Sequence, residues 1–174
     1  NSPEDFKSGF AVLIGRPNVG KSSLLNSILG HKVSIVSPIP QTTRYITRGV
    51  YNREKAQIVF VDTPGLHEHK YHLSNELNKM AMESLGGVDV IVYVVDATRK
   101  PYIEEEKIVS LLCSQKTPVI MAINKVDSSR KAMGDFIDRV KTTYKSGSVL
   151  TRLIIINVSV FVVLKVIGVI FILF

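Results

Sequence analysis

The chain has 174 residues, enough for one domain with a substantial core, and its 45% hydrophobic and 21% charged residues are typical of a globular protein. Its single cysteine, Cys113, excludes an internal disulfide and is expected in the core rather than as a nucleophile. Lysine and arginine exceed aspartate and glutamate by 22 to 15, and the resulting charge of +7 permits an anionic partner, such as a nucleotide, a nucleic acid or lipid headgroups, without selecting one.

Along the chain, apolar runs that are typical of buried strands alternate with segments of helical period. Strands are expected at residues 10–15, 45–52, 56–62, 88–96 and 118–124. Helices are expected at residues 21–30, 73–85, 102–112 and 130–140. Strands that are apolar throughout and alternate with helices predict an α/β fold with three layers (α/β/α), in which helices cover both faces of a mostly parallel central sheet.

The segment GRPNVGKS, residues 15–22, follows the first expected strand and opens the first expected helix. It fits the pattern G-x-x-x-x-G-K-[ST], which predicts a P-loop NTPase fold and a phosphate-binding loop. Glycines permit a backbone path whose N–H groups surround phosphate oxygens, Lys21 is expected to reach the terminal phosphates, and Ser22 is expected to bind Mg²⁺. The expected nucleotide contacts are Gly15, Arg16, Pro17, Asn18, Val19, Gly20, Lys21, Ser22 and Ser23. The alternative is a glycine-rich turn without a ligand.

The segment DTPG, residues 62–65, ends the third expected strand. Asp62 is expected at the carboxyl edge of the sheet, where α/β proteins bind ligands, and its carboxylate can hold a Mg²⁺-bound water. The Gly65 N–H can contact a terminal phosphate and release when that phosphate leaves. The expected nucleotide contacts here are Asp62, Thr63, Pro64, Gly65 and Leu66. A plain turn at the end of a strand is the alternative.

The segment NKVD, residues 124–127, ends another buried strand. Asp127 can accept both hydrogens that guanine presents on N1 and N2, whereas adenine has no matching donors and would leave the carboxylate unpaired. Asn124 can bond the other edge of the base, and the Lys125 stem can lie along the ring. Because this motif follows two phosphate elements in the expected order, it predicts that the ligand is GTP or GDP.

Four segments together, GRPNVGKSSLLN, SPIPQTTR, FVDTPGLH and NKVD, resemble the GTPase domain of Era, a family of bacterial GTPases within the TrmE-Era-EngA-like superfamily. The resemblance covers about residues 6–145. It implies an Era-type G domain over residues 1–149, with switch segments at about 33–47 and 62–75. The motifs of this domain are residues 15–22, 41–45, 62–66 and 124–127.

The resemblance implies an enzyme that hydrolyses GTP to GDP with Mg²⁺ and slow intrinsic turnover. Leu66 stands where many signalling GTPases carry a water-positioning glutamine, so no side chain is assigned as the catalytic base. The implied metal ligands are Ser22, Thr43 and Asp62, and the implied catalytic residues are Lys21, Thr43 and Gly65. The implied partners are the guanine nucleotide and the 16S ribosomal RNA of the small ribosomal subunit, in the cytoplasm; DNA is not an expected partner.

Residues 150–174 depart from the family pattern. Full Era proteins carry a carboxyl-terminal KH domain that binds ribosomal RNA through a GXXG loop, and this sequence has no GXXG after the GTPase motifs, so no KH domain is expected in it. The stretch LIIINVSV, residues 153–160, is a candidate for the last strand. It places Ser159, followed by valine, where the family has a Ser-Ala pair that makes the last guanine contact.

Three interpretations of the apolar end stay open: a last strand with an improvised closing segment, an end foreign to the family that packs poorly, or a membrane anchor. An anchor over residues 153–174 is long enough to span a bilayer but contains Asn157 and Lys165. Peripheral membrane association therefore stays open. The rival to the GTPase is a truncated or membrane-associated guanine-nucleotide-binding module with little turnover.

Overall fold

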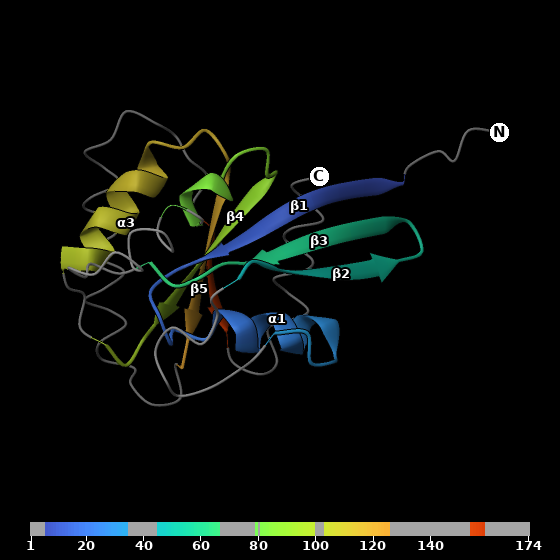
Figure 1. Cartoon of the computed structure of the whole chain (residues 1–174), viewed down its shortest axis with the longest axis horizontal. Helices are drawn as coiled ribbons and strands as arrows, with labels where there is room; N and C mark the ends of the chain where they lie inside the picture. The colour runs from blue at the N-terminus through green and yellow to red at the C-terminus, as the bar shows by residue number, and fades with distance from the viewer. Residues whose placement is uncertain are drawn as a thin grey trace.

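The computed structural model describes residues 6–34, 45–66, 79, 81–99, 103–125 and 154–158 (Figure 1). These residues form a six-stranded sheet in the order β2-β3-β1-β4-β5-β6. The strands are β1 (Lys7–Ile14), β2 (Thr47–Arg53), β3 (Ala56–Asp62), β4 (Val90–Asp96), β5 (Val119–Asn124) and β6 (Ile154–Val158). The helices are α1 (Lys21–Leu29) and α3 (Ile103–Cys113).

The described sheet is mostly parallel, as predicted. Only β2 and β3 pair antiparallel, in a hairpin whose strands are joined at residues 54–55. The other neighbours, from β3 through β1, β4 and β5 to β6, are all parallel. Parallel strands end at the same edge of a sheet, so the topology brings residues 15, 62, 96 and 124 to one edge.

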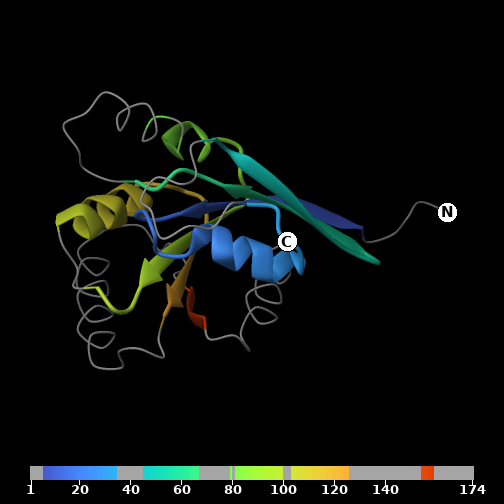
Figure 2. The ribbon, with the colours of Figure 1, turned by 60° about the horizontal axis from the view of Figure 1, so that its bottom comes forward.

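The central strands are buried because helices cover both sides of them. Every residue of β4 is buried, as are the first five residues of β5. Alternate residues of β1 point to opposite faces: Ala11 and Leu13 pack with α1, whereas Val12 and Ile14 pack with α3. Figure 2 shows the two helices on opposite sides of the central strands. The predicted α/β/α architecture is therefore confirmed.

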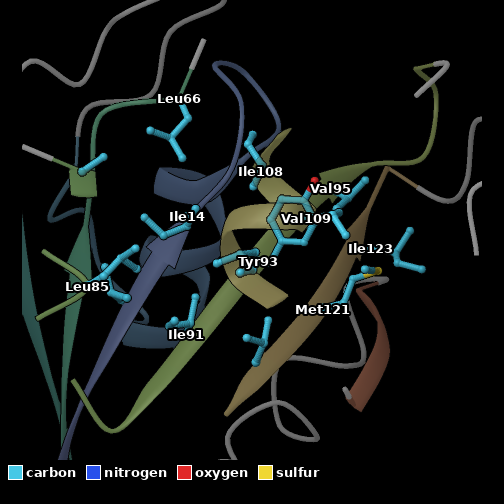
Figure 3. Close-up of a cluster of buried hydrophobic side chains, with 14 of the residues drawn as sticks. Ile14, Leu66, Leu85, Ile91, Tyr93, Val95, Ile108, Val109, Met121 and Ile123 are labelled. Atoms are coloured by element: carbon cyan, nitrogen blue, oxygen red, sulfur yellow. The ribbon is translucent and has the colours of Figure 1, made fainter. Parts of the chain in front are cut away.

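The cluster on the α3 face is the larger of the two apolar clusters (Figure 3). Tyr93 of β4 and Ile108 of α3 lie within it, and Leu85 extends it toward the hairpin side. Leu66, which follows β3, also belongs to this cluster and is only 7% exposed. The segment after β3 is thus anchored to the core on the face that carries α3.

The element boundaries differ from the prediction at exposed positions. β1 begins at Lys7 rather than Phe10, because backbone pairing with β3 continues where the side chains are exposed and the apolar pattern is lost. Of the helix expected at 73–85, the structure describes helical residues at Lys79 and at 81–83. The helix expected at 130–140 lies outside the described residues. α1 ends at Leu29, and Gly30 follows with a φ of 73°, as expected for a terminating glycine.

The backbone of residues 154–158 lies in the sheet as β6, with Ile154 opposite Ile120 and Val158 opposite Asn124. A continuous helix over residues 153–174 is incompatible with this strand. Residues 159–174 lie outside the described part of the chain. Within the described ranges, no helix combines the length and the apolar character that crossing a membrane requires.

Candidate functional site

Residues 15–20 form a loop that leaves the carboxyl end of β1 and enters the first turn of α1. Gly20 has a φ of 101°, in the left-handed region that favours glycine. A Cβ at this position would lie 2.1 Å from Nδ2 of Asn124, which is shorter than real Cβ contacts allow. Glycine at position 20 therefore lets the end of β5 pack directly against the loop.

All carbonyl groups of residues 15–20 accept a described hydrogen bond. The donors are the Leu66 N–H and Lys21 Nζ for Gly15, Lys21 Nζ for Arg16, Arg99 Nη1 for Pro17, Lys125 Nζ for Asn18, Asn124 Nδ2 for Val19 and the Leu24 N–H for Gly20. All of these peptides are trans, so the carbonyl and the N–H of each peptide point in opposite directions. Hydrogen bonds that fix the carbonyls therefore also fix the N–H groups, which point away from the hydrogen-bond donors. The loop is thereby shaped to present N–H groups to an anion.

Lys21 is 6% exposed, and its ammonium group donates 3.0 Å hydrogen bonds to the carbonyls of Gly15 and Arg16. Burial lowers the pKa of Lys21 from 10.5 to about 8, and the charge of the nearby Asp62 carboxylate partly opposes this shift. The site therefore holds a cation that water solvates poorly. A bound phosphate would supply the counter-charge that this cation lacks.

Ser22 lies in the first turn of α1, and its Oγ donates a 2.6 Å hydrogen bond to Oδ2 of Asp62 at the end of β3. Asp62 is fully buried, and burial raises the pKa of its carboxyl against the opposing effects of the Ser22 hydrogen bond and the Lys21 charge. Its other oxygen, Oδ1, has no hydrogen-bond partner among the described residues. Buried oxygens of this kind suit Mg²⁺, so the two side chains fit the predicted metal site. Thr43, the third predicted ligand, lies outside the described residues.

Residues 63–66 pack closely against the loop. Thr63 Oγ1 donates a 2.7 Å hydrogen bond to a backbone carbonyl of β1, and the Leu66 N–H donates one of 3.0 Å to Gly15. A Cβ on Gly65 would lie 2.5 Å from the Pro17 nitrogen, so a side chain at position 65 would force the two segments apart. The Leu66 side chain packs in the core, and as a hydrocarbon it has no group that could orient water.

The base motif is attached to the same loop. Asn124 Nδ2 donates a 2.9 Å hydrogen bond to the Val19 carbonyl, and its Oδ1 accepts one from the Lys125 N–H. Lys125 Nζ donates a 2.8 Å hydrogen bond to the Asn18 carbonyl. The sequence predicts base contacts for these two side chains, and the structure shows that both join β5 to the loop. The other predicted base contacts, Asp127 and Ser159, lie outside the described residues.

Two predicted nucleotide contacts, Ser23 and Pro64, have no described side-chain hydrogen bond to the loop. Ser23 is exposed on α1, where its carbonyl accepts a hydrogen bond from Ser27 Oγ within the same helix. Pro64 is buried between Thr63 and Gly65. The remaining predicted contacts within the described ranges lie in the loop, in the first turn of α1, at the end of β3 or at the end of β5.

Asp96, the last residue of β4, is a functional candidate that the sequence motifs do not identify. It is 3% exposed, and its Oδ2 accepts a 2.7 Å hydrogen bond from Lys125 Nζ and lies 3.3 Å from Arg99 Nε. Burial acts to raise the pKa of Asp96, but hydrogen bonds from Lys125 and Thr98 outweigh burial and hold the pKa below its usual value. One signal was available: a carboxylate that ends an apolar strand at the edge that carries the motifs.

Glu105 of α3 is a second residue that the motifs do not identify. The Arg16 Nη1 lies 3.1 and 3.0 Å from the two carboxylate oxygens of Glu105, and both side chains are largely buried. The pair joins the phosphate loop to α3. No short motif signals it, because the two residues are 89 positions apart.

The chain is similar to proteins of a known family. The family described as 50S ribosome-binding GTPase matches residues 10–125. The GTPase Era of Geobacter metallireducens is 44% identical over 139 residues, which cover 80% of this chain and 46% of that protein. The GTPase Era of Clostridioides difficile is 48% identical over 122 residues, which cover 70% of this chain and 41% of that protein. The chain thus spans less than half the length of these relatives.

Solved structures of Era are similar to the chain as well. Era in complex with MgGDPNP and a segment of 16S ribosomal RNA matches with a TM-score of 0.81 and 35% identity, over 95% of this chain and 56% of that one. A variant of Aquifex aeolicus Era bound to GDP and AlF₄⁻ matches with the same score and identity, over 94% of this chain and 56% of that one. From its motifs, its fold and the extent of the family match, the chain belongs to the family of 50S ribosome-binding GTPases, and it is similar to Era GTPases.

Proposed function

We propose that this chain binds GTP with Mg²⁺ and hydrolyses it to GDP and phosphate. The observation that carries the proposal is the loop of residues 15–20, whose carbonyls all accept described hydrogen bonds. This arrangement turns the N–H groups of the same peptides the other way, where they could bind an anion. The buried ammonium group of Lys21 adjoins this loop, and the Ser22–Asp62 pair lies one residue further along. Groups that could bind an anion, a buried cation and groups that could bind Mg²⁺ therefore lie at one edge of the sheet.

The chemistry assigns a role to each group. Mg²⁺, when bound, would neutralise charge on the transferred phosphate, and Ser22 and Asp62 would hold it. Lys21 and the loop N–H groups position the terminal phosphates and stabilise the charge that develops on their oxygens. We assign Thr43 to Mg²⁺ beside Ser22, and a further phosphate contact to the Gly65 N–H. Since leucine at position 66 cannot orient water by hydrogen bonding, slow intrinsic turnover is expected.

Guanine is the base that we assign to the ligand. Asp127 would accept the two hydrogens of the guanine edge, a pairing that adenine cannot satisfy. Asn124 and Lys125 support this assignment because their side chains bond the end of β5 to the phosphate loop. The groups assigned to the base and the groups assigned to the phosphates are therefore held together. Ser159 follows β6, the neighbour of β5, and is proposed as the last contact with the base.

The test of this function is phosphate release from GTP by the purified chain, with Mg²⁺ and with EDTA. Turnover should require Mg²⁺ and should be abolished by Lys21→Ala. The control is Lys79→Ala, because Lys79 is an exposed residue whose described ion pair is a long surface contact with Glu83. Turnover that persists in Lys21→Ala would contradict the proposed mechanism.

A second candidate function is a guanine-nucleotide-binding module with little turnover. The specific observation in its favour is the buried Leu66, which leaves that position without a water-orienting group. Tight binding of GDP without measurable phosphate release would select this alternative. Binding with Mg²⁺-dependent release would select the enzyme.

The wider role that we propose is cytoplasmic, in assembly of the small ribosomal subunit with ribosomal RNA as partner. Its support is the similarity to Era GTPases, one of which has been solved with a 16S ribosomal RNA segment. We also propose that residues 1–149 are the G domain and that residues 150–174 complete it with β6. Retention of the chain on 16S ribosomal RNA at moderate salt would support the first proposal, and flotation with anionic lipid vesicles would instead indicate a peripheral membrane contact.

A further inference from the structure

Three successive carbonyls of the phosphate loop are held by side chains from outside the loop. Arg99 Nη1 donates a 3.2 Å hydrogen bond to Pro17, Lys125 Nζ donates one of 2.8 Å to Asn18, and Asn124 Nδ2 donates one of 2.9 Å to Val19. These donors come from the ends of β4 and β5. The conformation of the loop therefore depends on what holds the donors in place.

A single buried carboxylate contacts two of these donors. Asp96 Oδ2 accepts a 2.7 Å hydrogen bond from Lys125 Nζ and lies 3.3 Å from Arg99 Nε. Its Oδ1 accepts hydrogen bonds of 2.9 Å from the Thr98 N–H and of 2.6 Å from the Thr98 hydroxyl. With both oxygens engaged, the carboxylate is fixed in orientation as well as in position.

We propose that Asp96 is a positioning residue for nucleotide binding, which holds Lys125 and Arg99 on the phosphate-loop carbonyls and so sets the base motif and the loop as one unit. The proposal rests on the proposed binding of guanine nucleotide. In the described part of the chain, the Asp96 carboxylate makes no hydrogen bond to the loop itself. Its effect on binding passes through the two cations, each of which makes one contact with the carboxylate and one with the loop.

The physical reason is the position of the charges. Lys125 and Arg99 are partly exposed, at 40% and 38% of their side chains, whereas Asp96 is 2% exposed. Without the carboxylate, both cations would gain solvation by turning outward, and the carbonyls of Pro17 and Asn18 would lose their donors. Because peptide orientation in the loop is fixed through these carbonyls, the N–H groups that face the phosphate would then become less ordered.

The test is a cycle of four proteins: wild type, Asp96→Asn, Lys125→Met and the double variant, each assayed by calorimetry for GDP binding. Asp96→Asn is expected to weaken GDP binding about tenfold, because it removes the charge that a charge-assisted hydrogen bond depends on. In the Lys125→Met background the same change is expected to cost about twofold, through Arg99 alone. Such non-additivity is the mark of a residue that acts through another.

A purely structural role would give a different result. If Asp96 only stabilises the turn after β4, the cost in GDP affinity will be equal in both backgrounds, and this result overturns the proposal. Unchanged GDP affinity in Asp96→Asn also overturns the proposed role of Asp96. The proposed function would not be affected by that result, provided that wild type binds GDP. Failure of wild type to bind GDP would remove both proposals.

A second variant serves if Asp96→Asn does not give soluble protein. Arg99→Gln removes the donor to Pro17 at a partly exposed position and is expected to weaken GDP binding about threefold. Unchanged affinity in Arg99→Gln would overturn the proposal in that case. Lys79→Met is the matched control, because it removes an exposed cation whose described ion pair is with Glu83, and it should leave GDP affinity unchanged.

Discussion

Ser22 and Asp62 are joined by a 2.6 Å hydrogen bond that connects the first turn of α1 to the end of β3, across 40 positions of sequence. The sequence assigns this hydroxyl and this carboxylate to Mg²⁺, and the hydrogen bond holds them beside each other. The second Asp62 oxygen has no hydrogen-bond partner among the described residues. A metal-bound water at this oxygen would satisfy a buried acceptor.

Asp62→Asn should therefore weaken the Mg²⁺-dependent part of GTP binding. The expected loss is about 10- to 100-fold in the presence of Mg²⁺, the range seen when groups that hold a metal's outer shell are removed. Binding in EDTA should change little. Fluorescence titration with a labelled GTP analogue, with and without Mg²⁺, measures both values. An equal loss under both conditions would show that Asp62 acts on the fold of the loop rather than through the metal.

The lowered pKa of Lys21 predicts a pH dependence of GDP affinity. Below pH 8 the free chain carries charged Lys21, and above about pH 8 this lysine loses its proton. Bound phosphates favour the charged form, so GDP affinity should fall by up to about tenfold per pH unit above pH 8. Calorimetry between pH 7 and 9 measures this slope. Lys21→Met is the control, because ionisation of guanine itself affects both proteins equally; the same slope in this variant would exclude Lys21 as the cause.

The same pKa shift has a consequence for folding. Between pH 8 and 10.5 the unfolded chain binds more protons at Lys21 than the folded chain does, so this group makes the free energy of unfolding rise with pH across that window. Wild type should therefore gain stability relative to Lys21→Met as the pH increases from 7.5 to 10. Urea unfolding of the two proteins at several pH values measures the difference. A difference that is constant or falls with pH would contradict the shift.

Glu105→Gln should destabilise the folded chain, because it leaves the largely buried Arg16 without its counter-charge. The expected loss is about 2 kcal/mol in the free energy of unfolding, below the usual cost for a fully buried pair because some solvent reaches this one. Glu83→Gln is the matched control, since its partner Lys79 lies 4.0 Å away on the surface, and the expected change is under about 0.5 kcal/mol. Equal effects of the two variants in urea unfolding would refute a stabilising role for the Arg16 pair.

Gly65→Ala should weaken GTP binding without a comparable loss of stability. A Cβ would meet the Pro17 nitrogen at 2.5 Å, so residues 65 and 66 must move away from the loop and the hydrogen bond from Leu66 to Gly15 must lengthen. Gly86→Ala is the control, because a Cβ there meets its nearest neighbour at an ordinary 3.5 Å. Parallel measurements of GTP affinity and unfolding midpoint distinguish the two effects. Normal GTP affinity in Gly65→Ala would show that the close approach is not required for binding.

Much of the fold could be predicted because its signals are local. The central strands β4 and β5 are continuous apolar runs, which is what burial on both faces requires. The phosphate and base motifs lie where strands end, so topology alone brings Lys21, Asp62 and Asn124 to one edge. The outer half of β1 was missed because backbone pairing holds it in the sheet while its side chains are exposed.

The supporting contacts of the site could not be predicted, because they join residues distant in sequence. Arg99 contacts Pro17 across 82 positions, and Glu105 contacts Arg16 across 89. Asp96 follows an apolar strand and looks from sequence like any strand-ending aspartate. Only the structure shows that it contacts two cations that also bind the loop.

Guanine-nucleotide binding is tested most directly by calorimetry of GDP with the purified 174-residue chain, with ADP as the control. We expect micromolar binding of GDP and no detectable binding of ADP, because the engaged carbonyls shape the phosphate loop and Asp127 is assigned to guanine. Equal binding of both nucleotides would contradict the base assignment. A soluble, folded chain that binds neither nucleotide would contradict the proposed function itself.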